Sequence, residues 1–274
     1  NVILNLFFVI VCHLGVAGVA LASMISQFIS AFLILRALLT GKEKYCLRLS
    51  EIRFDKRKAV GILQIGIPSA FQYSLFAFAN LFVQSSVNSF DHVLVEGNSA
   101  AANADPLVYD MMAAFYTACS SFIAQNFGAR KKKRILQTYL ICLFYSFITS
   151  LVLGVGIYLA RYPFLYLFTS DKAVVEAGIT RLSIMALSYS ASAFMDASIA
   201  ASRGLGKTAV PTFVVVMGSC VFRIIWIYTI FAYFHTIQSL YILYVFSWGI
   251  TAIAENIYFF HVYRHTLTEK KELC

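Results

Sequence analysis

The stretch VILNLFFVIVCHLGVAGVALASMISQFISAFLIL, residues 2–35, contains no Lys, Arg, Asp or Glu. As one α-helix it would be about 50 Å long, whereas the hydrocarbon core of a bilayer is about 30 Å thick. The stretch therefore has to fold back on itself, and Cys12-His13-Leu14-Gly15 is the natural turn. Residues 16–39 are long enough to span a membrane, whereas residues 2–11 are too short.

The rest of the chain repeats this pattern. Hydrophobic residues make up 60% of it and charged residues 13%, with a mean hydropathy of +0.75, which is outside the range of soluble domains. Six further apolar helices are expected at about residues 60–89, 97–127, 135–160, 175–202, 210–234 and 239–263. The sequence predicts an all-α polytopic membrane protein with seven complete transmembrane helices and a truncated one. We expect the chain to begin inside a transmembrane helix and to be part of a longer protein.

The basic residues predict the orientation. Eighteen of the 22 Lys and Arg fall on one side of the predicted spans, in positions Arg36, 42–58, 130–134, Arg203, Lys207 and 264–271. Loops rich in Lys and Arg stay in the cytoplasm. We therefore expect a plasma (inner) membrane protein with a cytoplasmic C-terminus. The net charge of +9 is explained by this topology, so no nucleic-acid partner is expected.

Polar side chains recur inside the predicted spans, where lipid offers them no partner. Tyr73, Asn80 and Gln84 lie within about 20° of one face of the 60–89 helix, at 100° per residue. Asn103, Asp105 and Tyr109 lie in the 97–127 helix, which should kink at Pro106, and Asp196 and Glu255 lie in the 175–202 and 239–263 helices. We predict that these side chains line a substrate or ion pathway.

A structural role stays open for each of them. The amides of Asn80 and Gln84 could equally form hydrogen bonds between helices. Arg223, in the middle of the 210–234 helix, is either a structural cation paired with an acid or a cation of the pathway. Asp196 and Glu255 serve either ion coupling and substrate binding or structural pairing.

No motif for catalysis or metal binding is present in the sequence. It lacks HExxH, GxSxG and Walker patterns, and its six cysteines lack metal-site spacing. We therefore expect neither an enzyme nor a metal or other cofactor. Transport driven by an ion gradient remains as the predicted class of function.

Four short motifs at the ends of these helices resemble the MATE (multidrug and toxic compound extrusion) family of the MOP flippase superfamily. They are Gly15-Val16-Ala17-Gly18-Val19-Ala20, Gly66-Ile67-Pro68-Ser69, Gln125-Asn126-Phe127-Gly128-Ala129 and Arg203-Gly204-Leu205-Gly206-Lys207. Each is weak alone, but they occur in the family's order and at the predicted boundaries.

The resemblance implies a two-lobe, twelve-helix transporter. Residues 1–40 would be the end of the N-terminal lobe (part of helix five, and helix six), 41–58 the cytoplasmic linker, and 59–274 the C-terminal six-helix lobe. Its partners would be the missing N-terminal lobe, the lipid bilayer, and small amphiphilic or cationic substrates that are exported in exchange for Na⁺ or H⁺.

Two positions bear on the coupling ion. Phe76 stands where some branches of the family carry a sodium-binding glutamate, and Asp196 can serve as the helix-ten acid. The coupling ion therefore stays open. Two alternatives also stay open: a lipid-linked oligosaccharide flippase of the same superfamily, and a seven-helix membrane receptor or sensor. A flippase groove would carry several cations, whereas Arg223 is accompanied by four acids.

Overall fold

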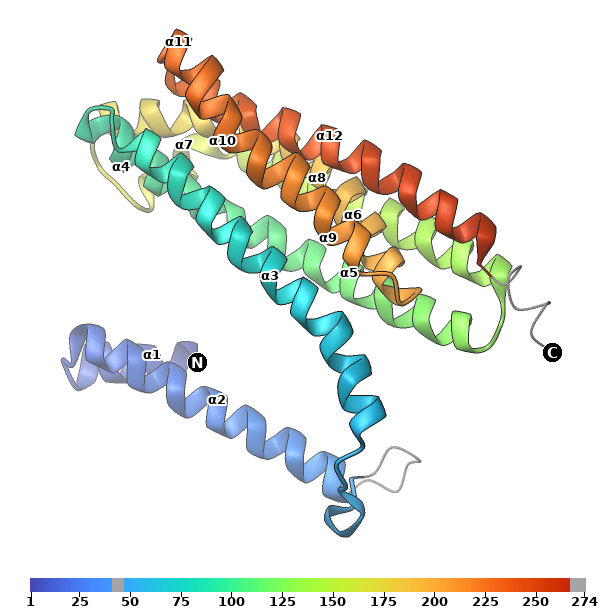
Figure 1. The fold of residues 1–274 in the computed structure, drawn as a ribbon. Coiled ribbons are helices and arrows are strands. Elements are labelled where there is room, and N and C mark those ends of the chain that lie inside the picture. The colour runs from blue at the N-terminus through green and yellow to red at the C-terminus, as the bar shows by residue number, and fades with distance from the viewer. Residues whose placement is uncertain (41–46, 267–274) are drawn as a thin grey trace. The chain divides into compact units, whose positions relative to one another are not determined.

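The computed structural model describes residues 1–40 and 47–266, and these residues form helices and connecting turns without a strand (Figure 1). The elements are α1 (Val2–Leu6), η1 (Phe7–Val11), α2 (Gly15–Thr40), η2 (Leu49–Glu51), α3 (Lys56–Val87), α4 (His92–Ala102), α5 (Ala104–Gly128), α6 (Lys132–Leu159), α7 (Arg161–Tyr166), α8 (Lys172–Gly204), α9 (Ala209–Val215), η3 (Val216–Val221), α10 (Phe222–Trp226), η4 (Ile227–Phe231), α11 (Ala232–Phe234) and α12 (Ile237–His265).

Seven helical segments among the described residues are long and apolar enough to cross a membrane. They are Gly15–Thr40, Lys56–Val87, His92–Gly128, Lys132–Leu159, Lys172–Gly204, Ala209–Phe234 and Ile237–His265. A shorter apolar helix, Val2–Val11, precedes them. The predicted fold class, seven full spans and a short one, is confirmed, with boundaries shifted by at most a few residues.

The fold-back predicted at residues 12–15 is present. His13 and Gly15 take the left-handed conformation, with φ of 51° and 53°, which ends the first helix and starts α2. Left-handed backbone suits glycine but strains a residue with a side chain. Gly18 then lies against Phe8, because a Cβ atom at Gly18 would be 3.0 Å from the Phe8 Cβ.

The chain divides into two compact units, residues 1–59 and 60–274. In the stretch predicted to be the linker, residues 47–58 contain η2 and the start of α3. Residues 41–46 lie outside the described part of the chain, as do residues 267–274, on which the prediction of a cytoplasmic C-terminus falls.

α8 lies at the centre of the second unit (Figure 1), where it packs against α4, α5, α6 and α12. Glycines allow the helix backbones to approach closely. A Cβ atom at Gly97 of α4 would lie 2.7 Å from the Val174 carbonyl oxygen, and one at Gly154 of α6 would lie 2.1 Å from that of Ala186. Small residues at helix contacts are typical of membrane bundles, because packing rather than water exclusion holds the helices together.

Two spans depart from regular α-helix. The span from residue 92 to 128 breaks at Asn103, just before Pro106, which lacks an N–H and crowds the carbonyl of the preceding turn. The predicted kink is therefore present. The span Ala209–Phe234, expected as one regular helix, contains two π-helical turns, η3 and η4, and Arg223 lies between them. π-turns within helices are frequent at functional sites.

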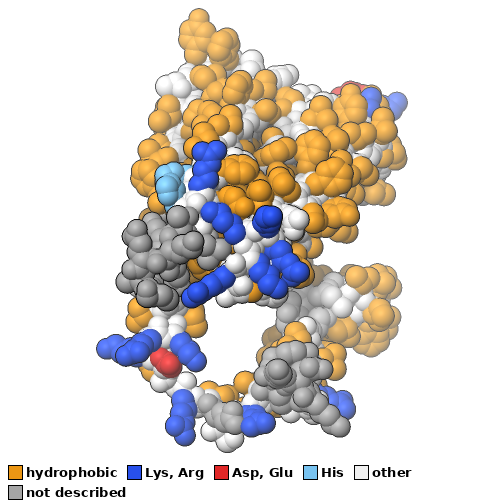
Figure 2. All heavy atoms as spheres, turned by 90° about the vertical axis from the view of Figure 1, so that its right-hand side faces the viewer, with side chains coloured by type: hydrophobic (Ala, Val, Ile, Leu, Met, Phe, Trp, Pro, Cys, Tyr) orange, Lys and Arg blue, Asp and Glu red, His pale blue; other side chains and the backbone are white. Residues whose placement is uncertain are grey.

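The ends of α6 and α12 meet at one end of the second unit. The Lys132 ammonium donates a hydrogen bond of 2.8 Å to the Arg264 carbonyl and lies 5.2 Å from the centre of the Tyr263 ring. Figure 2 looks onto this end of the molecule and shows Lys and Arg side chains gathered beside a broad hydrophobic surface. Lys132 and Arg264, which belong to different basic segments of the sequence, are thus neighbours.

Candidate functional site

A cavity of about 580 Å³ lies within the second unit, between α3, α4, α5, α8 and α12. Six of the eight predicted pathway residues line it: Tyr73, Asn80, Gln84, Asp105, Tyr109 and Asp196. They come from three helices, so the fold brings together polar faces that the sequence could assign only helix by helix. The cavity therefore combines carboxylates, amides and phenols at membrane depth.

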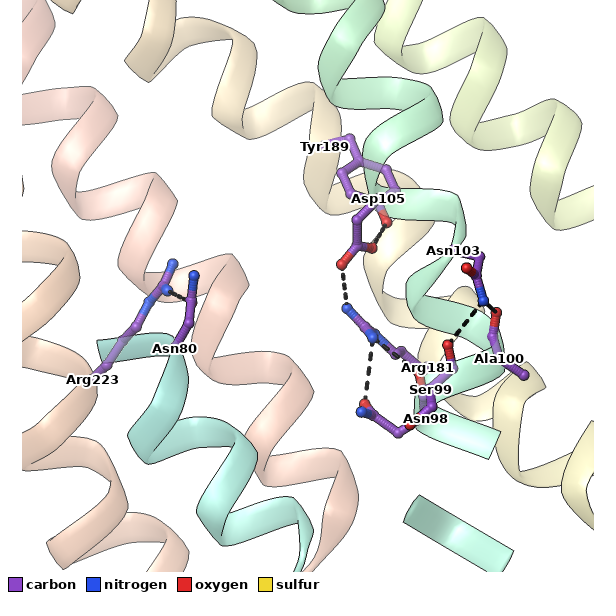
Figure 3. A network of polar contacts seen from close by, with 9 residues as sticks. All are labelled: Asn80, Asn98, Ser99, Ala100, Asn103, Asp105, Arg181, Tyr189 and Arg223. Carbon is purple, nitrogen blue, oxygen red and sulfur yellow. Dashed lines mark hydrogen bonds and ion pairs between the residues drawn. The ribbon is translucent and has the colours of Figure 1, made fainter. Parts of the chain in front are cut away.

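Asp105 forms the ion pair of this cavity. Its Oδ2 is 2.5 Å from Nη2 of Arg181, and its Oδ1 accepts a hydrogen bond from the Tyr189 hydroxyl (Figure 3). Arg181 also donates to the backbone carbonyl of Asn98 at 3.1 Å and to its side-chain oxygen at 3.4 Å. The network joins α4, α5 and α8, and it neutralises Asp105 within the bundle.

Arg223 is fully buried, with 0% of its surface exposed. Its Nη1 donates to Asn80 at 2.8 Å and its Nε to Ser247 at 3.3 Å, and Figure 3 shows the contact with Asn80. The guanidinium lies 4.7 Å from the ring centre of Phe76 and 4.5 Å from that of Tyr244. Among the described residues no acid forms an ion pair with Arg223, and the choice between a structural cation and a cation of the pathway stays a prediction. Two aromatic faces take the place of an acid, because a guanidinium plane interacts favourably with π-systems.

Asp196 and Glu255 carry the buried carboxylate oxygens that lack a hydrogen-bond partner among the described residues. Oδ2 of Asp196 and both carboxylate oxygens of Glu255 are buried without a hydrogen bond. Arg203 interacts electrostatically with both acids. Its guanidinium is held by Gln72, whose side-chain oxygen accepts from Nη2 at 2.9 Å. Arg203, at the end of α8, therefore attracts both acids electrostatically but forms a hydrogen bond with neither.

Asn103, Glu255 and Arg223 do not line the cavity. The Asn103 amide donates to the carbonyls of Ser99 and Ala100, both at 3.1 Å, and so stays within α4. Glu255 is buried in α12, and Arg223 lies behind Asn80 and Phe76, two residues that do line the cavity. Their part in a pathway stays a prediction.

A family model, MatE, matches residues 68–229, more than half of the chain. The chain belongs to the MATE family. Members of this family are transporters and not enzymes. Membership in the family excludes the alternative of a seven-helix receptor. It confirms the resemblance to the MATE family that the four motifs indicated.

Relatives of this MATE chain include a "Probable multidrug resistance protein NorM" of Thermotoga maritima, 24% identical over 204 residues, or 73% of this chain and 43% of the relative. Another is a "Probable multidrug resistance protein YoeA" of Bacillus subtilis, 26% identical over 181 residues, or 64% of this chain and 39% of the relative. The chain thus spans less than half the length of these curated relatives.

Solved structures show the same fold. A MOP superfamily transporter from Pyrococcus furiosus superposes with a TM-score of 0.88 at 20% identity, over 97% of this chain and 60% of that one. The bent form of a Vibrio cholerae MATE transporter, VcmN, gives 0.79 at 19% identity, again over 97% and 60%. At this identity the likeness concerns the fold alone.

The polar residues of the MATE chain's cavity that were not among the predicted ones include Gln72, Tyr116, Arg181 and Arg203. Arg181 carried a signal, namely a charge deep in an apolar helix. Gln72 lies beside the polar face of α3, and its oxygen accepts from both Arg203 and Thr212 of the neighbouring spans. From the sequence, Arg203 was interpreted only as a basic residue of a loop. In the structure its side chain points into the bundle and contacts Gln72.

Aromatic rings form the wall of the cavity opposite α3. Trp248 lies 6.2 Å from Tyr109, 6.3 Å from Tyr189 and 5.5 Å from Tyr244, measured between ring centres. Edge-to-face and tilted pairs at these distances are favourable. The Trp248 Nε1 is buried without a hydrogen-bond partner among the described residues. Tyr109, Tyr244 and Trp248 therefore supply an aromatic lining to the cavity.

Proposed function

We propose that this chain is part of a secondary active efflux transporter that expels drugs or other organic cations in exchange for Na⁺ or H⁺. The observation that carries the proposal is the cavity, about 580 Å³, that Asp196 lines inside a MATE-type bundle. A volume of this size suits a small amphiphilic molecule. The aromatic wall adds surfaces on which flat or cationic groups can bind.

The charges of the cavity support a cationic cargo. Arg181 is neutralised by Asp105, so the pair adds no net charge to the cavity. Asp110 and Asp196 also line it, against Arg203 as the remaining cation. The excess of acid favours positively charged molecules, because a low-dielectric cavity strengthens the attraction.

Asp196 is the residue we propose for ion coupling. Its free Oδ2 can hold a proton or contribute to a sodium site, and Arg203 supplies a nearby charge that opposes either ion. Export of the substrate is then coupled to uptake of the ion, if the ion and the substrate compete for the Asp196 carboxylate. Glu255, buried with both oxygens unpartnered, is a second candidate.

The lobes are proposed as the resemblance implies. Residues 1–40 would close the N-terminal lobe, 41–58 would link the lobes, and 59–274 would form the C-terminal lobe, with its C-terminus in the cytoplasm. The coverage of the Thermotoga relative, 43%, supports a partner lobe outside this sequence.

The test uses the full-length protein in proteoliposomes with ethidium as the transported dye. We expect Asp196→Asn to lower gradient-driven efflux by about tenfold or more, because a lost charge-assisted contact costs about 1.5–3 kcal/mol. Imposing a Na⁺ gradient and a pH gradient separately identifies the coupling ion. Glu255→Gln is the second variant of the series.

The matched control is Glu176→Gln, which removes an exposed acid of the same helix, α8. Its efflux should equal that of the unaltered protein. If Asp196→Asn and Glu255→Gln both transport normally, the acidic site is not where coupling occurs.

A flippase for lipid-linked oligosaccharides is the second candidate. The observation that favours it is the pair of arginines in the cavity wall, Arg181 and Arg203, since guanidinium groups bind pyrophosphate. The ion pair of Arg181 with Asp105 weakens this case. Loss of lipid-linked cargo translocation in Arg203→Gln, without any dye transport in the unaltered protein, would favour the flippase.

A further inference from the structure

A second, separate pocket lies at the basic end of the bundle, between the last turns of α5 and the first turns of α6. Its volume is about 480 Å³. Both helices contribute residues three or four positions apart, so one face of each helix lines the pocket. The residues that matter here are Phe122, Gln125, Lys131, Arg134, Gln137 and Ile141.

Two cations at the mouth of this pocket are uncompensated. Lys131 and Arg134 are exposed, and neither has an ion pair or a side-chain hydrogen bond with another described residue. Gln125, Gln137 and the Thr138 hydroxyl add neutral donors to the same wall. An ammonium, a guanidinium and amide donors around one space form the donor set that recognises phosphate.

The turn between the helices holds Lys131 in place. The Arg130 N–H donates to the Phe127 carbonyl at 3.0 Å, and the Lys131 N–H donates to that of Asn126 at 2.9 Å. The Lys131 backbone is therefore tied to α5, while its side chain borders a pocket that α6 completes.

The other half of the pocket is apolar and faces outward. Phe122 is 54% exposed and Ile141 55% exposed, and both belong to helices that span the membrane. A free phosphate ion would leave these surfaces unused, whereas a lipid would cover them with an acyl chain. Polar donors at the interface above apolar surface at hydrocarbon depth match an amphiphile of the bilayer.

We propose that this pocket binds an anionic phospholipid, with its phosphate between Lys131 and Arg134 and an acyl chain along Phe122 and Ile141. The site lies outside the central cavity and does not depend on what that cavity transports. It distinguishes two residues within the basic run 130–134, since Lys133 belongs to the run but does not line the pocket.

Lys133 therefore provides a matched control with the same loss of charge. The full-length protein, purified in a neutral detergent, would be titrated with phosphatidylglycerol, and bound lipid would be counted by native mass spectrometry. Lys131→Gln and Arg134→Gln should each weaken binding by about tenfold, the loss expected from one charge-assisted contact. Lys133→Gln should weaken it less than about threefold, as expected of a screened surface charge.

Three outcomes would overturn the proposal. Equal losses in Lys131→Gln and Lys133→Gln would mean diffuse attraction to the basic loop. Equal binding of phosphatidylcholine would mean that anionic charge is not selected. Displacement of the lipid by inorganic phosphate at equal concentration would mean that the headgroup alone is recognised.

The apolar half is tested separately. Ile141→Ser should weaken phosphatidylglycerol binding but leave the binding of glycerol 3-phosphate unchanged, whereas Lys131→Gln should weaken both. Unchanged lipid binding in Ile141→Ser would contradict the acyl-chain position. Thermal unfolding of each variant, measured without added lipid, checks that the fold is retained.

Discussion

At the residue scale, Asp105 and Arg181 are coupled strongly enough to test as a pair. Arg181 has 8% of its side chain exposed and Asp105 has 32%. We expect Asp105→Asn to destabilise the protein by about 3 kcal/mol, the low end for breaking a buried pair, since Arg181 is left without a counter-charge. Chemical unfolding in detergent, followed by tryptophan fluorescence, measures the loss.

The double variant Asp105→Asn with Arg181→Gln is the control for this prediction. Removing both charges should cost less than the sum of the two single losses, because neither charge is then buried alone. Additive losses would show that the two side chains act independently.

The sequence could place single polar side chains on helix faces but could not pair them. Asp105, Tyr109 and Asp196 were predicted from the cost of polar groups in lipid, which depends on one helix alone. The partner of Asp105 is Arg181, 76 residues further along the chain, and helical periodicity carries no information about contacts between helices. For the same reason the sequence could not name the neighbours of Arg223, which are Asn80, Ser247 and two aromatic rings.

At the element scale, the close approach of α6 to α8 at residue 154 requires a glycine. The Gly154 position faces the Ala186 carbonyl at a distance too short for any Cβ atom. We expect Gly154→Ala to separate the helices and to destabilise the protein by about 1–3 kcal/mol, the usual cost of overpacking. The melting temperature in detergent is the measurement.

Gly156 offers a control on the same helix, two residues further on. No atom lies within 4 Å of a Cβ built there, so Gly156→Ala should be neutral or slightly stabilising. Equal losses in both variants would point to helix flexibility rather than to close packing.

The positions of the membrane-spanning helices could be predicted from the sequence, but the pattern of backbone hydrogen bonds within them could not. Long apolar runs between charged loops locate the spans because hydropathy alone decides them. The π-helical turns at residues 216–221 and 227–231 lie within one apolar span whose single charged residue is Arg223, and composition there does not distinguish an i→i+4 from an i→i+5 bond. Unlike these turns, the helix break at Asn103 has a cause that can be read from the sequence, namely Pro106.

At the scale of the whole molecule, transport should require more chain than residues 1–274. The proposal of a second lobe rests on relatives of which the chain covers 43% and 39%. We expect residues 1–274, reconstituted alone, to show no gradient-driven ethidium efflux, because a cleft between two lobes would lack one wall. The full-length protein in parallel liposomes is the positive control, and efflux by the shorter chain would refute the requirement.

The way α3 is attached has a consequence for mechanics. α4, α5 and α6 meet α8 at glycines with their backbones in contact, so separating them would open voids. α3 is attached differently. Its Gln72 and Asn80 accept hydrogen bonds from Arg203 and Arg223, and its Val83 and Val87 pack against apolar side chains of the last two spans. Water can take the place of either partner in such a bond, and a cation can replace the arginine as the partner of the amide oxygen. We therefore expect α3, whose glycines make no close contact with another helix, to be the compliant wall of the second unit and to move away from the cavity more readily than α4, α5 or α6.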